Sequence, residues 1–208
     1  MTPRTDSGVA TRQRIIDAAM KTVIARGYAG ASARTIAKAG DFNQALIFYH
    51  FGSVNSLMLA ALDAAAGDAM KRYRDALEKT AETSDATELI ERAIALYRED
   101  LDSGHITLLT ELVGAGLSHP DLADGLIKRM EPWIGFAEEA IVRVIKDSFL
   151  EPILSAVSLR TAATAVVAMY LGVDVFLRLD SSGKMSKDLF KAAETLKPFV
   201  GGALGAGR

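Results

Sequence analysis

Residues 32–53 hold the side chains whose types and spacing indicate a definite chemistry. Ser32 and Asn43 each precede a stretch with helical apolar spacing, and both side chains cap helices by accepting a backbone N–H bond. Gly40 and Asp41 lie between the two stretches, and both residue types tolerate left-handed turn angles. This spacing predicts two short helices joined by a tight turn, the form of a helix-turn-helix that reads DNA.

The second predicted helix has an inner and an outer face. Phe42, Ile47 and Phe51 are spaced to point inward. The residues spaced to point outward are Gln44, Ala45, Phe48 and Tyr49. We therefore expect a partly apolar helix face that contacts something outside its own domain.

Longer helices must position these two. Residues 11–26 predict a first helix that ends at Gly27, and a further helix is expected from Ser53 to near Lys79, where it links to the rest of the chain. The inward stripe of the first helix is Ile15, Ala18, Ala19, Thr22 and Val23. The basic residues Lys71, Arg72 and Arg74 lie too far along the helix that begins at Ser53 to reach the same DNA face. We therefore interpret them as part of a solvated surface.

Charge is distributed unevenly along the chain. Residues 1–56 contain seven basic and three acidic side chains, a net charge of +4, whereas the whole chain carries −2. The remainder is therefore acidic. If the N-terminal part binds DNA phosphates, it must carry positive charge although the rest of the chain is acidic, because a uniformly acidic surface repels DNA.

Four segments, residues 11–19, 26–28, 36–37 and 47–53, match a known pattern. Together they resemble, without a gap from Thr11 to Leu57, the DNA-binding domain of the TetR family of bacterial transcriptional regulators. The resemblance implies an all-α fold, with an N-terminal three-helix helix-turn-helix DNA-binding domain and a C-terminal helical ligand-binding and dimerisation domain. The expected division is a disordered arm at 1–10, the DNA-binding domain at 11–56, and the effector-binding and dimerisation domain at 57–208.

The resemblance also implies roles for single residues. Proteins similar to this one place the second helix of the motif in the major groove, where Gln44 can read a base edge and Ala45 can contact a thymine methyl. Tyr49 and His50 are then expected at phosphates, with a charged backbone contact from Arg34. The expected DNA-binding residues are Arg34, Asn43, Gln44, Ala45, Phe48, Tyr49 and His50. The sequence departs from the family at Phe48, which often is Tyr, and at Val54, which commonly is Lys.

From Ala86 onward the apolar pattern is helical, with breaks indicated near 102–104, 114–119, 150–152 and 180–183. Residues 155–179 are apolar on two sides, so this helix needs two partners, one in its own domain and one in a second subunit. The helix at 187–200 is expected to join the same dimer interface. Within the apolar run, Asp174 is best explained by an ion pair with Arg178 one turn later, and the glycine-rich residues 201–208 are expected to fray.

Pro132 predicts a kink or break in the helix around it, beside Trp133. Aromatic and methionine side chains near a kink can wall a small-molecule cavity, although the same residues can simply pack a core. The expected effector-binding residues are His105, Glu111, Met130, Trp133, Phe136, Met169 and Tyr170.

Composition argues against several other kinds of protein, among them enzymes, metal-binding proteins and membrane proteins. The chain has no cysteine, which excludes disulfides and thiolate zinc sites, and its three histidines show no metal-ligand or nucleophile spacing, so neither an enzyme nor a cofactor is expected. No apolar run of roughly 18 residues and no signal peptide are recognised, so we expect a cytoplasmic protein without membrane contact. The sequence predicts a dimeric, ligand-responsive regulator of a double-stranded DNA operator, most simply a repressor. The alternative is a DNA-binding regulator controlled by a protein partner, without a small-molecule pocket.

Overall fold

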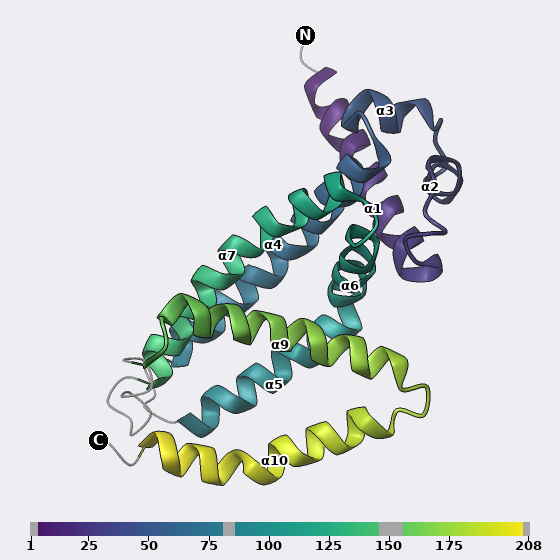
Figure 1. The fold of residues 1–208 in the computed structure, drawn as a ribbon. Coiled ribbons are helices and arrows are strands. Elements are labelled where there is room, and N and C mark those ends of the chain that lie inside the picture. Colours follow the sequence, from purple (N-terminus) through teal and green to yellow (C-terminus); the bar gives the residue numbers. More distant parts are fainter. Residues whose placement is uncertain (1–3, 81–85, 146–155, 206–208) are drawn as a thin grey trace. The chain divides into compact units, whose positions relative to one another are not determined.

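The computed structural model describes residues 4–80, 86–145 and 156–205, and every regular element in these ranges is an α-helix (Figure 1). The first four helices are α1 (Arg4–Arg26), α2 (Ala33–Gly40), α3 (Ala45–Phe51) and α4 (Val54–Thr80). They are followed by α5 (Ala86–Ser103), α6 (His105–Gly116), α7 (Pro120–Ile145), α9 (Leu159–Leu179) and α10 (Lys184–Gly205). The predicted all-α fold is confirmed. The helix break expected near 150–152 lies outside the described residues.

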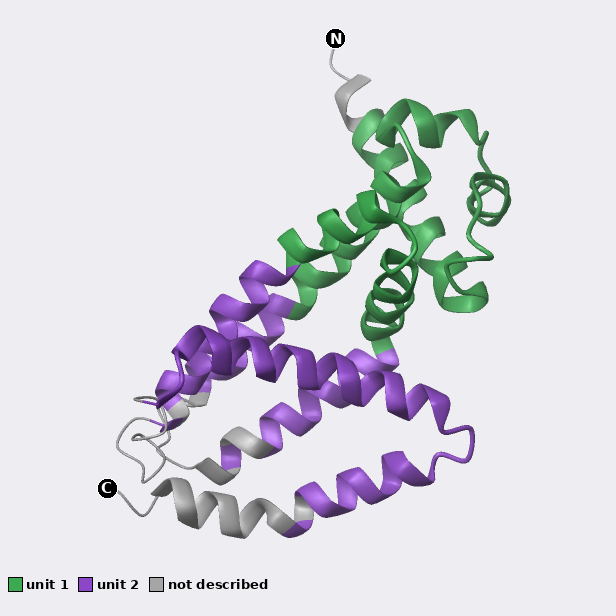
Figure 2. Cartoon of the chain, viewed as in Figure 1, with its two compact units in different colours: residues 1–69, 103–129 green, residues 70–102, 130–208 purple. Residues whose placement is uncertain are grey.

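Two compact units divide the chain (Figure 2). Unit 1 comprises Met1–Ala69 and Ser103–Arg129, and unit 2 comprises Met70–Asp102 and Met130–Arg208. The helix-turn-helix thus shares a compact unit with α6 and the beginning of α7. The expected boundary between residues 56 and 57 is not a boundary between these units, and the division into DNA-binding and effector-binding parts stays a prediction.

In unit 1, α1 buries the whole stripe that its spacing predicts and packs against α2 and α6. Ile15 and Val23 are fully buried, and Thr22 donates its hydroxyl to the Ala18 carbonyl at 2.6 Å, which removes the penalty of burying that hydroxyl. The helix ends at Arg26, and the next residue, Gly27, has a φ of 69°, in the left-handed region that favours glycine.

The start of α1 differs from the expectation. The helix begins at Arg4 rather than near Thr11, so residues 4–10 of the expected disordered arm are helical. Nucleation is the costly step in helix formation, whereas extension adds one hydrogen bond for each residue fixed. A polar segment joined to a well-packed helix can therefore extend it.

The beginnings of α4 and α7, together with α6, complete the core of unit 1. Its largest fully buried side chains outside α1 to α3 are Leu57, Met58, Leu62, Ile106, Leu108, Leu112 and Leu122. Ser53, at which this helix is expected to begin, precedes α4 and caps it, because its hydroxyl accepts the Ser56 N–H at 3.0 Å. Arg129 ties α7 to α4 through a two-point pair with Asp63, at 2.6 and 2.7 Å.

In unit 2, two helices continue past positions where an interruption was expected. Pro132 does not break its helix, because α7 continues through it, and the alternative of a kink there stays a prediction. Pro132 is exposed, so the Lys128 carbonyl that loses its helical partner can be solvated instead. Helix α10 continues to Gly205, into the segment expected to fray. Glycine weakens a helix by roughly 1 kcal/mol relative to alanine without interrupting a helix that is already formed.

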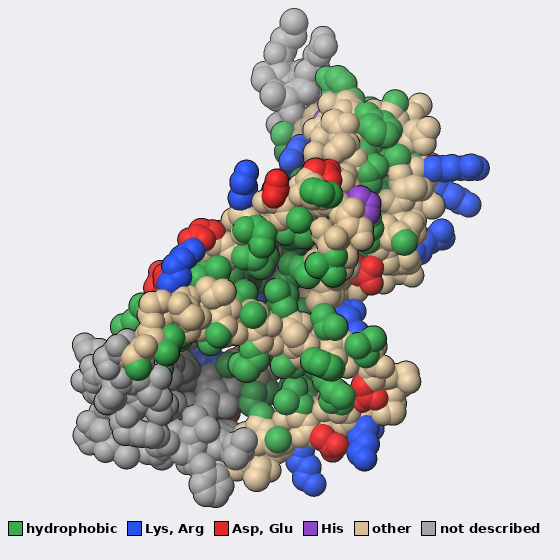
Figure 3. Space-filling view, in the orientation of Figure 1, with side chains coloured by type: hydrophobic (Ala, Val, Ile, Leu, Met, Phe, Trp, Pro, Cys, Tyr) green, Lys and Arg blue, Asp and Glu red, His purple; other side chains and the backbone are tan. Residues whose placement is uncertain are grey.

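Helix α9 turns one of its two apolar stripes outward. Ala163 and Asp174 are fully buried, whereas Met169 is 64% exposed and Phe176 is 61% exposed. Figure 3 shows hydrophobic side chains gathered over α9 in the face in view. By length and composition alone, α9 is long and apolar enough to cross a membrane, a property that the core helix of a water-soluble protein can share. Its apolar residues do not continue without interruption for 18 positions, because Asp174 and Arg178 lie among them. Helices α3 and α4 are long and apolar enough only when taken together, and a bend of 67° separates them.

Candidate nucleic-acid interface

Ser32 fixes the start of α2 by a reciprocal pair of hydrogen bonds. Its hydroxyl accepts the Thr35 N–H at 3.2 Å, and the Ser32 N–H donates to the Thr35 hydroxyl at 2.9 Å. This is a capping box in which Thr replaces the usual Glu or Gln. Ile36 and Ala37 are buried, so α2 is anchored by its inner face while Arg34 and Lys38 remain exposed. The predicted helix start is confirmed.

The turn between α2 and α3 uses its two predicted residues differently from the expectation. Asp41 takes the left-handed conformation, with φ 51° and ψ 57°, and Gly40 is the last residue of α2. Glycine is required at position 40 by close approach, because a Cβ there would overlap the Phe42 ring and lie 2.8 Å from Ala18 Cβ. Gly40 therefore lets the turn pack tightly onto α1.

Asn43 helps to start α3, one position earlier than a conventional cap. Its side-chain oxygen accepts the Ala45 N–H at 2.9 Å, whereas Gln44, which occupies the cap position, makes no capping hydrogen bond. The Gln44 side chain is exposed and is thus available for an external partner. An asparagine that bonds the backbone two residues later is a common way to shape such a turn.

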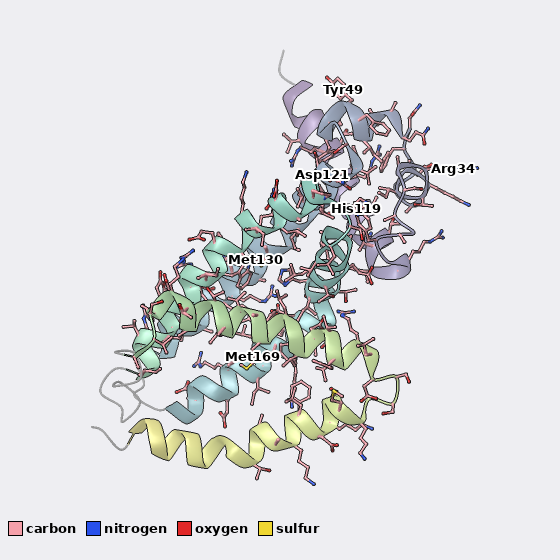
Figure 4. The ribbon with its side chains drawn as sticks, viewed as in Figure 1. Arg34, Tyr49, His119, Asp121, Met130 and Met169 are labelled. Carbon is pink, nitrogen blue, oxygen red and sulfur yellow. The ribbon has the colours of Figure 1, made fainter. Side chains whose placement is uncertain are left out.

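The two predicted faces of α3 differ in burial as expected. On the inner face Ile47 is fully buried, whereas Phe51, like Phe42 before the helix, is half-buried. On the outer face Phe48 is 50% exposed and Tyr49 is 82% exposed. Gln44 and Ala45 are also exposed, so the outer face presents an amide, a methyl group and two aromatic rings. Figure 4 shows Tyr49 on α3 and Arg34 on α2, both projecting from the helix-turn-helix.

His50 is half-buried between two aromatic neighbours. Its ring centroid lies 5.0 Å from that of Tyr49 and 6.3 Å from that of Phe51. The Arg12 guanidinium lies 4.8 Å from the centre of the Phe51 ring, an arrangement typical of a cation–π contact. Basic and aromatic groups of α1 and α3 therefore meet at the end of α3.

The seven residues predicted to bind an effector fall into both units. His105 and Glu111 belong to unit 1, and the other five, Met130, Trp133, Phe136, Met169 and Tyr170, belong to unit 2. The Glu111 carboxylate accepts the Tyr28 N–H at 2.8 Å, which gives it a role within unit 1. Met169 is exposed, whereas Trp133 and Phe136 each meet the edge of Tyr73, with ring centroids 5.6 and 5.9 Å apart.

Unit 2 also contains a buried polar hub that the sequence did not indicate. Asp100 is fully buried, and its carboxylate accepts hydrogen bonds from Arg72 at 2.6 Å and from the Tyr73 and Tyr170 hydroxyls at 2.8 Å each. Burial, followed by the Asp100 charge, raises the pKa of Tyr73, and burial is likewise the main cause of the raised pKa of Tyr170. The interpretation of Arg72 as a solvated residue is therefore wrong.

A second ion pair lies close to this hub in the same unit. Arg178 donates to Asp174 at 2.6 Å, which confirms the predicted pair. Tyr97 meets Tyr170 edge-on at 5.5 Å, and burial together with the Asp174 charge raises the pKa of Tyr97 to about 12. No sequence spacing identifies Asp100 or Tyr97, because their partners lie on other helices. In the described part of the chain, no group of three potential metal ligands occurs.

Comparison with known proteins places the helix-turn-helix in a family. Residues 15–61 match the family model described as bacterial regulatory proteins, tetR family. No curated protein matches the chain in sequence.

Several solved structures share the fold along almost the whole chain. A TetR-family member from Streptomyces coelicolor A3 is 26% identical, with a TM-score of 0.63 over 91% of this chain and 96% of that one. GusR of Salmonella enterica is also 26% identical, with a TM-score of 0.65 over 94% and 95%. The multidrug binding protein EbrR, complexed with proflavin, is 25% identical, with a TM-score of 0.51 over 91% and 98%.

Proposed function

This chain belongs to the TetR family of bacterial regulatory proteins, and from that premise we propose a repressor that binds a palindromic operator as a homodimer and is released by a small apolar effector. Family membership establishes a DNA-binding transcription regulator. The observation that carries the proposal further is the outer face of α3, which is exposed inside the matched segment although half of it is apolar. Exposed aromatic surface of this kind marks a site of interaction.

Direct reading of bases falls to Gln44 and Ala45. An amide can form two hydrogen bonds with adenine in the major groove, and a methyl group can contact thymine. Tyr49, His50 and Arg34 would contact the sugar-phosphate backbone, which fixes the position of α3 without conferring sequence preference. Phe48 cannot donate a hydrogen bond to phosphate, so the exposed Tyr49 hydroxyl is the phenolic donor on this face.

Dimerisation is supported by the uncovered apolar surface of α9 and α10. The outward apolar residues of α9 are Val166, Met169, Val175, Phe176 and Leu179, and those of α10 are Met185 and Leu189. Such a surface is unfavourable in water unless a second copy covers it. A two-fold dimer also supplies the paired reading helices that a palindrome requires.

Effector binding in unit 2 is supported by its aromatic side chains and by unpaired polar atoms. Among the described residues, the Tyr97 hydroxyl and Asp174 Oδ1 are buried without a hydrogen-bond partner. Buried polar atoms are normally paired, so a bound molecule that offers a hydrogen-bond donor is one way to satisfy them. The likeness to EbrR, crystallised with proflavin, also favours a small-molecule ligand. DNA binding places the protein in the cytoplasm.

Selection of duplexes from a random pool tests this function. The selected sequences should contain an inverted repeat whose half-site centres lie about 34–36 Å apart, or a multiple of that distance. A variant with Gln44→Ala and Tyr49→Ala provides the control for non-specific enrichment. Recovery of single, unpaired half-sites, or of no preferred sequence, would contradict the proposed dimeric repressor.

A further inference from the structure

Three polar side chains of unit 1, far apart in the sequence, form a continuous line of hydrogen bonds. The Tyr28 hydroxyl donates to Asn55 Oδ1 at 2.7 Å, and Asn55 Nδ2 donates to Asp121 Oδ2 at 2.8 Å. We call Tyr28, Asn55 and Asp121 the polar latch. The Asn55 amide accepts one hydrogen bond through its oxygen and donates the other through its nitrogen. Tyr28 must therefore be a donor and Asp121 an acceptor.

Two residues of the polar latch, Tyr28 and Asn55, lie on either side of the helix-turn-helix in the sequence. Tyr28 lies in the turn after α1, and Asn55 is the second residue of α4, so α2 and α3 lie in the segment that the Tyr28–Asn55 hydrogen bond closes. Fixing the two ends of a segment reduces the conformations available to it. The latch therefore restrains the helices whose outer face is exposed.

Asp121 anchors the other end of the latch to the first turn of α7. Hydrogen bonding from Asn55, aided by backbone N–H groups and by His119, lowers the pKa of Asp121. A carboxylate in the first turn is also favoured by the helix dipole. Figure 4 shows Asp121 and His119 near each other where α7 begins, and the His119 ring meets the edge of Tyr28 at 5.5 Å.

Helix α6 holds the same turn from a second side. The Tyr28 N–H donates to the Glu111 carboxylate at 2.8 Å, and a Cβ at position 27 would lie 2.9 Å from the same carboxylate. Glycine at this position thus gives Glu111 access to the backbone. The turn after α1 is consequently held directly by α4 and α6, and through Asn55 by the first turn of α7.

We propose that the polar latch positions the reading helix, so that operator affinity depends on Asn55 and Asp121, which lie outside the helix-turn-helix. The inference rests on the proposed DNA binding. It assigns Asn55 and Asp121 a positioning role, because they act through the orientation of α3. A folded protein without the latch should retain its sequence preference but bind every duplex more weakly.

A reciprocal exchange tests this role. Asn55→Asp places two carboxylates against each other and should lower operator affinity roughly tenfold, a typical coupling for groups in one hydrogen-bond network. Adding Asp121→Asn should restore affinity to within about threefold, because the amide introduced at position 121 can donate to the carboxylate introduced at position 55. Asp124→Asn, at an exposed position of the same helix, controls for the loss of a negative charge.

Affinity should be measured by fluorescence anisotropy on the selected operator, with urea unfolding of the same samples in parallel. A role confined to stability would shift the unfolding midpoint and leave the affinity of the folded protein unchanged, and that result would overturn the inference. Failure of the double variant to recover would also overturn it. Absence of DNA binding by the wild-type protein would instead refute the proposed function, on which the latch's role depends.

Discussion

Among single residues, Gln44 carries the sharpest expectation for DNA recognition. Its side chain is exposed at the start of α3 and makes no capping hydrogen bond. Gln44→Ala should relax base preference at one symmetric pair of operator positions, and it should weaken binding by about 1–3 kcal/mol for each two-point hydrogen-bonded pair with a base that it removes. Repeating the duplex selection with this variant measures the change. An unchanged motif would show that Gln44 does not read bases.

Arg34→Ala provides the contrast to Gln44→Ala. Arg34 is exposed on α2 and is proposed to contact phosphate. Its loss should weaken binding to all sequences alike and reduce the slope of affinity against salt concentration by about 1. A change in the selected motif would assign Arg34 to base reading instead.

Asp100 is the residue whose removal should most affect the stability of unit 2. Asp100→Ala leaves the Tyr73 and Tyr170 hydroxyls without their acceptor, at about 1–3 kcal/mol for each buried group left unpaired. Glu99→Ala is the matched control, because Glu99 is 57% exposed and pairs with the same arginine at 3.5 Å. An exposed pair contributes at most about 1 kcal/mol. If Asp100→Ala and Glu99→Ala lower the free energy of unfolding equally, the buried hydrogen bonds of Asp100 do not stabilise unit 2 as proposed.

The tyrosines make stability sensitive to alkaline pH. Burial raises the pKa of Tyr97 to about 12 from the ordinary value of 10.0. Above pH 10 the unfolded chain loses phenolic protons that the folded chain keeps, so the free energy of unfolding falls as pH rises towards 12. The difference between the phenolate absorbance titrations of the wild type and Tyr97→Phe isolates this group. A midpoint near 10 for that difference would contradict its burial.

Among the helices, α9 is the one whose exposed apolar side chains we expect a second subunit to cover. Ala165→Glu and Phe176→Glu each place a charge on the outward stripe, where a dimer contact would leave it buried and unpaired. Both variants should therefore sediment as monomers or become insoluble, whereas Lys71→Glu, on an exposed position of α4, should remain dimeric. Dimers formed by both α9 variants would place the interface elsewhere.

At the scale of the whole molecule, effector and operator binding should be reciprocally coupled. Helices α4 and α7 each continue from one compact unit into the other, which gives a covalent path between the proposed effector site and the head. If an effector lowers operator affinity, operator DNA must lower effector affinity by the same factor, typically 5–150-fold. Trp133 is the only tryptophan, so its fluorescence reports binding in unit 2. A ligand that quenches Trp133 but leaves operator affinity unchanged would refute the coupling.

The sequence alone determined those features that depend on neighbours within one turn of a helix. The cap at Ser32, the buried stripe of α1, the two faces of α3 and the Asp174–Arg178 pair were all predicted correctly. Each depends on contacts between residues two to four positions apart, which regular helix geometry fixes. The family resemblance has the same local character, since it lies within one continuous segment.

Tertiary structure decided which side chains meet across helices. The left-handed residue of the turn is Asp41, because Gly40 is needed where α1 and Phe42 approach closely. Arg72 pairs with Asp100 across 28 positions of sequence, and Asn55 meets Asp121 across 66. Such pairings follow from how helices pack, and a single helix pattern specifies which face is apolar but not which helix will cover it.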